Sequence, residues 1–166
     1  MCIRDRLAPF DCHITVLRRS PDALPGVNRT ATLSELNEVL PIADAVVLAL
    51  ALTPETAGVI GAEQLALMKS TAWIVNVARG GHIDTDALVA ALDAGAIGGA
   101  ALDVTDPEPL PAGHRLWSIS NCLITPHVGN TPEAGLALLA DRVSENVARY
   151  LNDDRLIGIV DVEQGY

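Results

Sequence analysis

Apolar residues recur along this chain in two patterns that alternate with each other. Short continuous runs rich in β-branched residues predict buried strands, which cover residues 13–17, 44–50, 73–77, 98–104 and 122–125. The segments between these runs carry apolar residues at helical spacing. Strands that alternate with helices imply right-handed crossovers and a parallel, doubly wound sheet, so the predicted fold class is α/β.

Capping residues mark the ends of the predicted helices. Thr32-Leu33-Ser34-Glu35 has the capping-box pattern and opens a short helix. A second helix covers 61–69, and a third covers 84–95 between a capping aspartate and a terminating glycine. Thr131-Pro132 opens a long helix, and its apolar residues share one face: Leu136, Leu139, Val143, Val147 and Tyr150.

The start of the chain lacks a feature that a nucleotide-binding doubly wound sheet normally has. Such a sheet opens with a strand and a Gly-x-Gly-x-x-Gly turn. The sequence contains no such pattern, and Gly95, Gly98 and Gly99 lie between a helix and a strand rather than after a strand. We therefore expect a Rossmann-like sheet without its first strand and glycine-rich turn, and a non-native or truncated start at residues 1–5.

Length and composition limit the class of protein. The 166 residues suffice for one domain with a core, and 49% hydrophobic against 19% charged residues argues against disorder. The net charge is −10 without any cluster of lysines or arginines, so nucleic acid and anionic membranes are poor partners. The longest apolar run, 45–52, is much shorter than the ~20 residues that span a bilayer.

Cysteine usage and the N-terminal sequence indicate a compartment. Cys2, Cys12 and Cys122 are odd in number and lack metal-type spacing, which favours reduced thiols and no bound metal ion. The start of the chain has no apolar core of a signal peptide. We expect a soluble, cytoplasmic protein.

Three side chains capable of chemistry follow predicted strands. Arg79 ends a strand beside two glycines, so its guanidinium could bind a carboxylate through two parallel hydrogen bonds. Glu108 lies in a proline-rich loop after the next strand, and His127 follows the last one. A histidine oriented by a carboxylate is the usual general acid–base pair. Each residue alone also fits another role: a surface arginine in a turn, a solvated acid, and a structural histidine.

Four linked motifs resemble those of a known family. They are Leu52-Thr53-Pro54-Glu55-Thr56, Asn76-Val77-Ala78-Arg79-Gly80-Gly81, Ala101-Leu102-Asp103-Val104 through Glu108-Pro109-Leu110, and Thr125-Pro126-His127. In this order they make the chain similar to the NAD(P)-binding domain of the D-isomer-specific 2-hydroxyacid dehydrogenases. The resemblance implies an incomplete dinucleotide-binding domain at 6–152, a C-terminal tail at 153–166, and a substrate domain outside this sequence.

The resemblance also implies a role for each residue. Arg79 would bind the substrate carboxylate and help to polarise the keto oxygen, and His127 would donate a proton to that oxygen as hydride arrives. Glu108 would hydrogen-bond His127 and fix its tautomer. The cofactor would contact Thr53, the Ala78 carbonyl, Asp103 and Gly129. Asp103 could instead be a plain cap at the end of its strand.

The choice of cofactor can be argued from Arg18-Arg19-Ser20, which follows the first predicted strand. An NAD-preferring fold usually has an acid at this place, which binds the ribose hydroxyls. Two arginines and a serine suit a 2′-phosphate better, so NADP is slightly favoured over NAD. The alternative is a pair of solvated arginines in an NAD enzyme.

The predicted function is NAD(P)-dependent interconversion of a small 2-keto acid and its D-2-hydroxy acid, as in a hydroxypyruvate or glyoxylate reductase. The intact protein is expected to be a homodimer, and this chain alone is expected to be inactive. A rival from another class is a dinucleotide-sensing protein that keeps the fold without turnover. A relationship to formate dehydrogenases is disfavoured, because their histidine pairs with a glutamine and this chain has Glu108.

Overall fold

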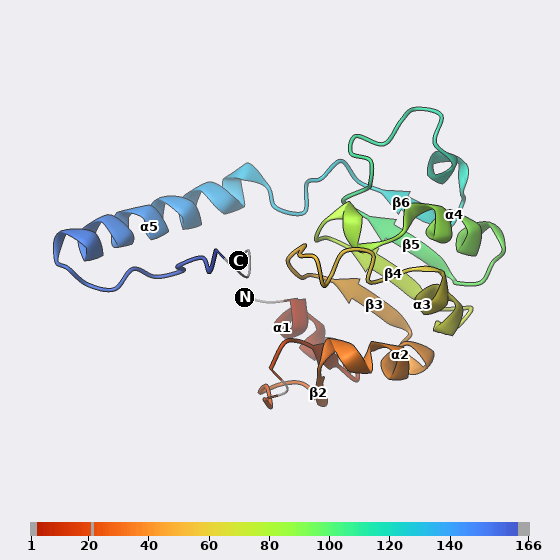
Figure 1. Cartoon of the computed structure of the whole chain (residues 1–166), viewed down its shortest axis with the longest axis horizontal. Coiled ribbons are helices and arrows are strands. Elements are labelled where there is room, and N and C mark those ends of the chain that lie inside the picture. The colour runs from red at the N-terminus through yellow and green to blue at the C-terminus, as the bar shows by residue number, and fades with distance from the viewer. Residues whose placement is uncertain (1–2, 21, 163–166) are drawn as a thin grey trace.

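The computed structural model describes residues 3–20 and 22–162, which form a sheet-based domain and a projecting helix (Figure 1). The α-helices are α1 (Ile3–Leu7), α2 (Leu36–Val39), α3 (Ala62–Leu67), α4 (Thr85–Asp93) and α5 (Pro132–Leu151). Short 3₁₀ helices are η1 (Ala8–Phe10), η2 (Leu33–Glu35), η3 (Leu40–Ile42), η4 (Gly80–His82) and η5 (Arg115–Ser118). Cys2 and the end of the tail, 163–166, lie outside the described residues.

All paired strands are parallel, which confirms the predicted α/β class. A four-stranded sheet has the order β3 (Ala45–Leu48), β4 (Trp73–Asn76), β5 (Gly99–Leu102) and β6 (Cys122–Ile124). Its register places Val75 of β4 opposite Val47 on one side and Ala101 on the other. A separate two-stranded sheet joins β1 (Thr15–Leu17) to β2 (Arg29–Ala31).

The division into two sheets fits the predicted lack of a first strand. In the doubly wound order, the first strand lies between the second and the fourth. The β1–β2 pair corresponds to one side of that position and β3–β6 to the other, and no strand pairing joins the two sheets among the described residues. The fold is therefore Rossmann-like, with its sheet interrupted at the place of the glycine-turn strand.

The core lies where α3 and α4 pack on the four-stranded sheet. Ile74 and Ala100 are fully buried in the two central strands, because each of these strands has a neighbour on both sides. Leu65 of α3 and Leu88 of α4 cover them, and burial of a leucine of this kind stabilises by about 1.5–3 kcal/mol. The Asp84 carboxylate accepts a hydrogen bond from the Ala87 amide (3.0 Å), so α4 begins where the sequence predicts.

The helix predicted after Thr32 forms its capping box but is shorter and less regular than the sequence predicts. The Glu35 carboxylate accepts a hydrogen bond from the Thr32 amide (2.8 Å), as the capping-box pattern predicts. The helix that follows is divided into η2, α2 and η3, and Pro41 lies in the last of these turns. A proline has no amide hydrogen to continue the helical ladder, which accounts for the short α segment.

Helix α5 projects away from the sheets and carries its apolar face into solvent (Figure 1). Leu139 is 58% exposed and Tyr150 is 75% exposed, although both belong to the apolar stripe of the sequence. The tail returns along the helix, where the Asn146 side chain bonds both the amide and the carbonyl of Ile157. Within the described residues, no helix combines the length and apolar character needed to cross a bilayer.

Candidate active site

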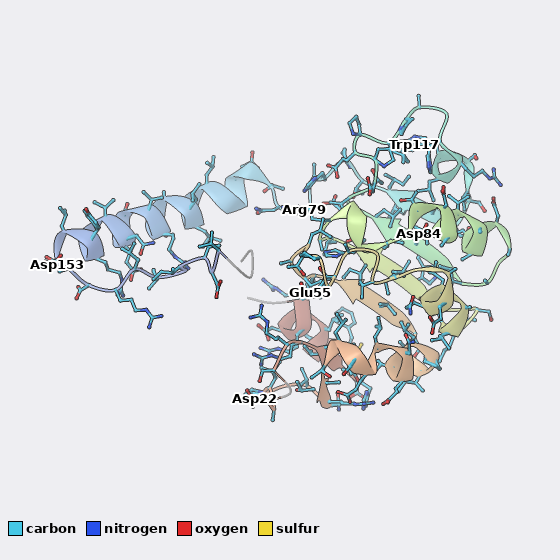
Figure 2. The ribbon with its side chains drawn as sticks, viewed as in Figure 1. Asp22, Glu55, Arg79, Asp84, Trp117 and Asp153 are labelled. Atoms are coloured by element: carbon cyan, nitrogen blue, oxygen red, sulfur yellow. The ribbon has the colours of Figure 1, made fainter. Side chains whose placement is uncertain are left out.

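The carboxyl ends of β3 and β4 open onto a cavity of about 580 Å³. Its lining comes from the two segments that follow these strands: Ala49, Leu50, Ala51, Leu52, Val77, Ala78 and Arg79. Figure 2 shows Arg79 at this edge of the domain, on the side from which α5 projects. This edge is where open α/β sheets bind ligands.

Asn76 shapes the turn that presents Arg79. Its side chain is almost completely buried, accepts a hydrogen bond from the Ala78 amide (3.0 Å) and donates one to the Arg79 carbonyl (2.8 Å). Gly80 lets this turn approach the segment after β5, because an added Cβ would lie 2.0 Å from the Thr105 carbonyl oxygen. The sequence marks Asn76 only as the polar end of a strand, so its role is found from the structure.

The Arg79 guanidinium is exposed and only partly engaged. One nitrogen, Nη1, donates to the carbonyl of the preceding Ala78 (2.6 Å), and in the described part of the chain the side chain forms no ion pair. A guanidinium has five N–H donors, so most of them are available to a ligand. Arg79 can therefore take a carboxylate at the mouth of the cavity.

His127 and Glu108 meet across the strand ends, as the sequence predicts. His127 Nδ1 lies 2.6 Å from Glu108 Oε1, and the two side chains are 47% and 41% exposed. An ionised carboxylate only accepts hydrogen bonds, so the pairing places the proton on Nδ1 and leaves Nε2 for a ligand. The pair has the arrangement of a general acid–base histidine with its orienting carboxylate.

Asp103 follows β5 and is buried beneath the segment that carries His127. Its carboxylate accepts hydrogen bonds from the Thr125 hydroxyl (2.5 Å), the Val128 amide (2.9 Å) and the Gly129 amide (2.7 Å). The Thr125 bond first, then the two amide bonds and the charge of His127, lower the pKa of Asp103 against the opposing effect of burial. The structure thus brings Asp103 and Gly129 together.

The segment after β3 forms a turn around Thr53. The Thr56 hydroxyl accepts from the Thr53 amide and donates to the Ala51 carbonyl, both at 2.8 Å. The Thr53 hydroxyl donates to Glu55 (2.7 Å), and this bond is the largest cause that lowers the pKa of Glu55. Figure 2 shows Glu55 on the same side of the domain as Arg79.

His82 holds this turn in place from below. The ring is fully buried, with Nδ1 3.1 Å from the Thr56 carbonyl oxygen and Nε2 3.1 Å from the Leu50 carbonyl oxygen. The sequence indicates only a core or surface position for His82. Its partners lie 26 and 32 residues away, so no local pattern could reveal them.

Arg18, Arg19 and Ser20 follow β1 and therefore belong to the two-stranded sheet. The Ser20 hydroxyl donates to the Asp22 carboxylate, an acid that the sequence argument for NADP overlooks. The charge of Arg19 is the last of the causes that lower the pKa of Glu55, so Arg19 lies towards the turn after β3. No group of three acidic, histidine or cysteine side chains suitable for a metal occurs in the described ranges.

A parallel Rossmann-like sheet with these side chains at its carboxyl edge defines the nucleotide-binding domain of a dehydrogenase. The particular family follows from comparison. The protein-family model described as "D-isomer specific 2-hydroxyacid dehydrogenase, NAD binding domain" matches residues 1–129 of the sequence. The chain therefore belongs to this family.

Relatives of known structure show the same fold. A D-isomer specific 2-hydroxyacid dehydrogenase from Xanthobacter autotrophicus Py2, in complex with NADPH and MES, is 38% identical with a TM-score of 0.88, over 98% of this chain and 66% of that chain. An NADPH-dependent glyoxylate/hydroxypyruvate reductase from Sinorhizobium meliloti, in complex with NADP and sulfate, is 30% identical with a TM-score of 0.90, over 98% of this chain and 52% of that one.

Sequence relatives are about twice as long as this chain. Glyoxylate/hydroxypyruvate reductase A from Yersinia enterocolitica is 32% identical over 164 residues, which cover 99% of this chain and 52% of the relative. An uncharacterised protein from Corynebacterium melassecola is 41% identical over 162 residues, which cover 53% of its length. The chain therefore spans about half the length of these relatives.

Proposed function

We propose that the intact protein reduces a small 2-keto acid to its D-2-hydroxy acid with NAD(P)H, and catalyses the reverse reaction. The observation that carries this proposal is the 2.6 Å contact between His127 Nδ1 and Glu108 Oε1 at the exposed carboxyl edge of the sheet. Arg79 lies at the same edge with most of its donors unused. Family membership supports the reaction type.

Proton transfer is assigned to His127. With Nδ1 bonded to Glu108, Nε2 is the ring nitrogen left to give a proton to the keto oxygen during reduction, or to accept it during oxidation. The Glu108 carboxylate would fix the ring orientation and stabilise the charge of the protonated imidazole. General acid–base catalysis of this kind contributes about 10²–10⁴-fold to a rate.

Substrate binding is assigned to Arg79. Its planar guanidinium can form two parallel hydrogen bonds to the carboxylate of a keto acid, which fixes the neighbouring carbonyl in one orientation. The positive charge would also stabilise the negative charge that develops on the keto oxygen. The proposal therefore requires a substrate with a carboxylate directly beside the reacting carbon.

The residues that follow the strands of the larger sheet fit a dinucleotide in several respects. Thr53, the Ala78 carbonyl and the Gly129 backbone lie in segments at the carboxyl ends of β3, β4 and β6. Asp103 uses three of about four acceptor positions of its carboxylate, which leaves one for a nicotinamide carboxamide. A bound nicotinamide would supply the hydride for the reaction.

NADP is the proposed cofactor, with NAD as the alternative. Arg18 and Arg19 would attract a 2′-phosphate, and the Ser20 hydroxyl would exchange its Asp22 partner for a phosphate oxygen. The relatives from X. autotrophicus and S. meliloti, whose structures contain NADPH or NADP, support this choice. Asp22 opposes it, because a carboxylate repels a phosphate.

Two of the relatives are glyoxylate/hydroxypyruvate reductases, so glyoxylate and hydroxypyruvate are the first substrates to test. The cytoplasmic location and the homodimer of the intact protein are also proposals. The chain described here lacks the glycine turn, so we expect it to bind cofactor weakly and to catalyse little. Robust turnover by this 166-residue chain alone would contradict that expectation.

The experiment that tests the function is oxidation of NADPH and of NADH by a full-length version with a panel of 2-keto acids. Turnover with glyoxylate or hydroxypyruvate, and a lower KM for NADPH, is the expected result. Tight cofactor binding without turnover of any acid would favour the rival, a dinucleotide-sensing protein. Turnover of keto compounds that lack a carboxylate would contradict the assignment of Arg79.

A further inference from the structure

We propose that Asp103 is a positioning residue for proton transfer, and that it acts by holding the segment 125–129 so that His127 stays against Glu108. The proposal deepens the function proposed above and rests on it for its catalytic consequence. Its structural part concerns only residues of this chain. It goes beyond a cofactor contact or a plain strand cap, because the groups that Asp103 binds lie on another segment.

Three hydrogen bonds connect Asp103 to both sides of His127. Oδ1 accepts from the Thr125 hydroxyl and the Val128 amide, and Oδ2 accepts from the Gly129 amide. Thr125 precedes His127 by two residues, and Val128 and Gly129 follow it directly. The Asp103 carboxylate therefore holds the Thr125 side chain before the histidine and two backbone amides after it.

The backbone of His127 requires such support. Its φ is +54°, in the left-handed region that residues other than glycine rarely adopt. Its own amide bonds the Thr125 carbonyl (3.0 Å) within a tight turn. Without the bonds to Asp103, this turn could relax to an ordinary conformation, and the ring would leave Glu108.

Asp103 is itself fixed to the central strands. Its amide donates to the Asn76 carbonyl of β4 (2.9 Å), and the side chain of Asn76 shapes the turn of Arg79. The side chain of Asp103 is only 8% exposed, so it cannot move freely. Asn76 and Asp103 together connect the turn of Arg79 to the turn of His127 through the core of the sheet.

The residues around the Asp103 carboxylate allow segment 125–129 to approach it closely. A Cβ added to Gly129 would lie 2.8 Å from Asp103 Oδ2, so glycine lets the Gly129 amide approach the acid closely. All three partners are donors, which a carboxylate satisfies and an asparagine does not. In Asp103→Asn, the amide nitrogen of the new side chain would face an N–H or O–H donor.

The first test is nuclear magnetic resonance on this chain, with 15N-labelled histidine. We expect the wild type to show His127 protonated at Nδ1, and Asp103→Asn to lose this Nδ1–H signal together with the positive φ. Thr125→Val removes one bond without changing Asp103 and should cause a partial loss. Asp93→Asn is the matched control, because Asp93 is also hydrogen-bonded but pairs with Arg115 on another part of the surface.

An unchanged His127 signal and φ in folded Asp103→Asn would overturn the proposal. If Asp103→Asn does not fold, the same spectrum of Thr125→Val tests the proposal. An unchanged His127 signal in that variant would overturn it equally. Both measurements are independent of catalysis, so they separate a failure of this inference from a failure of the proposed function.

The second test measures kinetics in a full-length version. Misplacement of His127 should lower kcat by about 10²-fold in the Asp103 variants. Thr125→Val, which keeps the Asp103 carboxylate for the cofactor, should lower kcat to a smaller extent and leave the KM for the cofactor nearly unchanged. Asp103→Asn, which keeps one acceptor oxygen, should retain more activity than Asp103→Ala. A raised cofactor KM with an unchanged kcat would contradict positioning and indicate a cofactor contact alone. Absence of turnover in the wild type would contradict the proposed function, while the resonance test would still decide the role of Asp103.

Discussion

At the scale of single residues, the candidate site consists of side chains whose hydrogen-bonding groups have few partners among the described residues. Among the residues that the structure describes, Arg79 bonds only its neighbour Ala78, while His127 and Glu108 bond each other and remain open to solvent. Such an arrangement is not needed for folding, because exposed pairs contribute only about 0–1 kcal/mol to stability. We therefore interpret these three residues as parts of a binding and reaction site.

Replacement of Arg79 tests the carboxylate assignment. Arg79→Lys keeps the charge but loses the planar pair of donors, so we expect the KM for the keto acid to rise by about tenfold in a full-length version. Arg115→Lys is the control, because Arg115 forms its bidentate contact with Asp93 on another part of the surface. Steady-state kinetics at saturating cofactor measures the effect, and equal KM values in both variants would contradict the assignment.

At the scale of elements, the positions of the strand ends follow from contacts between distant segments. The turn after β3 is held by His82, which lies in η4 after β4, and the turn after β6 is held by Asp103 after β5. Each turn of the site is thus fixed by a residue from a neighbouring connection. Changes in these supports should affect both stability and the geometry of the site.

His82→Ala should destabilise this chain. The substitution removes the buried imidazole and the hydrogen bond that it donates to a half-buried carbonyl, and a hydrogen bond of this kind contributes about 0.5–1.5 kcal/mol. Urea unfolding followed by circular dichroism measures the loss. His13→Ala, at an exposed position, is the control and should change little. Equal midpoints for the two variants would show that His82 does not support the turn.

At low pH, the free energy of unfolding of this chain should depend on the protonation of Asp103. Its hydrogen bonds lower its pKa in the folded state below the ordinary 3.8, so its stabilisation is complete above that value and is lost as pH falls through the lowered pKa. Urea midpoints between about pH 5 and pH 2 should therefore fall. Asp103→Asn, which has no proton to bind, should show a shallower fall, and identical slopes would contradict this assignment.

At the scale of the whole molecule, the sheet domain and α5 behave as separate parts. The apolar face of α5 lies in solvent, and none of the residues of this helix whose burial is described belongs to the core. The compact part of the chain therefore ends near Asn130 (Figure 1).

Removal of residues 131–166 tests this division. We expect the free energy of unfolding to change by no more than about 0.5 kcal/mol, because the described part of the deleted segment contributes no residue to the core. Self-association should decrease, since exposed apolar side chains such as Leu139 and Tyr150 are lost. Urea unfolding and sedimentation measure the two effects. A large fall in stability would show that α5 packs on the domain.

The sequence predicts those parts of the fold that a local pattern determines. Five of the six strands and the start of α4 coincide with apolar runs and a capping aspartate. Strand β2 was not predicted, because Arg29–Ala31 is only three residues long and has no apolar run. The apolar residues of α5 were predicted to share one face of a helix. Their spacing does not show which part of the protein, if any, this face packs against.

One contact of the candidate site was predicted from the sequence. The meeting of His127 with Glu108 is confirmed, since both follow parallel strands and so reach the same edge of the sheet. The supporting roles of Asn76 and His82 could not be predicted, because each depends on partners brought close by folding. The cofactor contacts of Thr53, Ala78 and Arg18 stay predictions.

The measurement that tests the central claim most directly is the turnover of glyoxylate and hydroxypyruvate by a full-length version before and after His127→Ala. Since the histidine supplies the proton, we predict that kcat falls by about 10²–10⁴-fold while the variant remains folded and still binds cofactor. His114→Ala, at the start of η5, is the matched control and should keep the wild-type rate. A wild-type rate in His127→Ala would contradict the account.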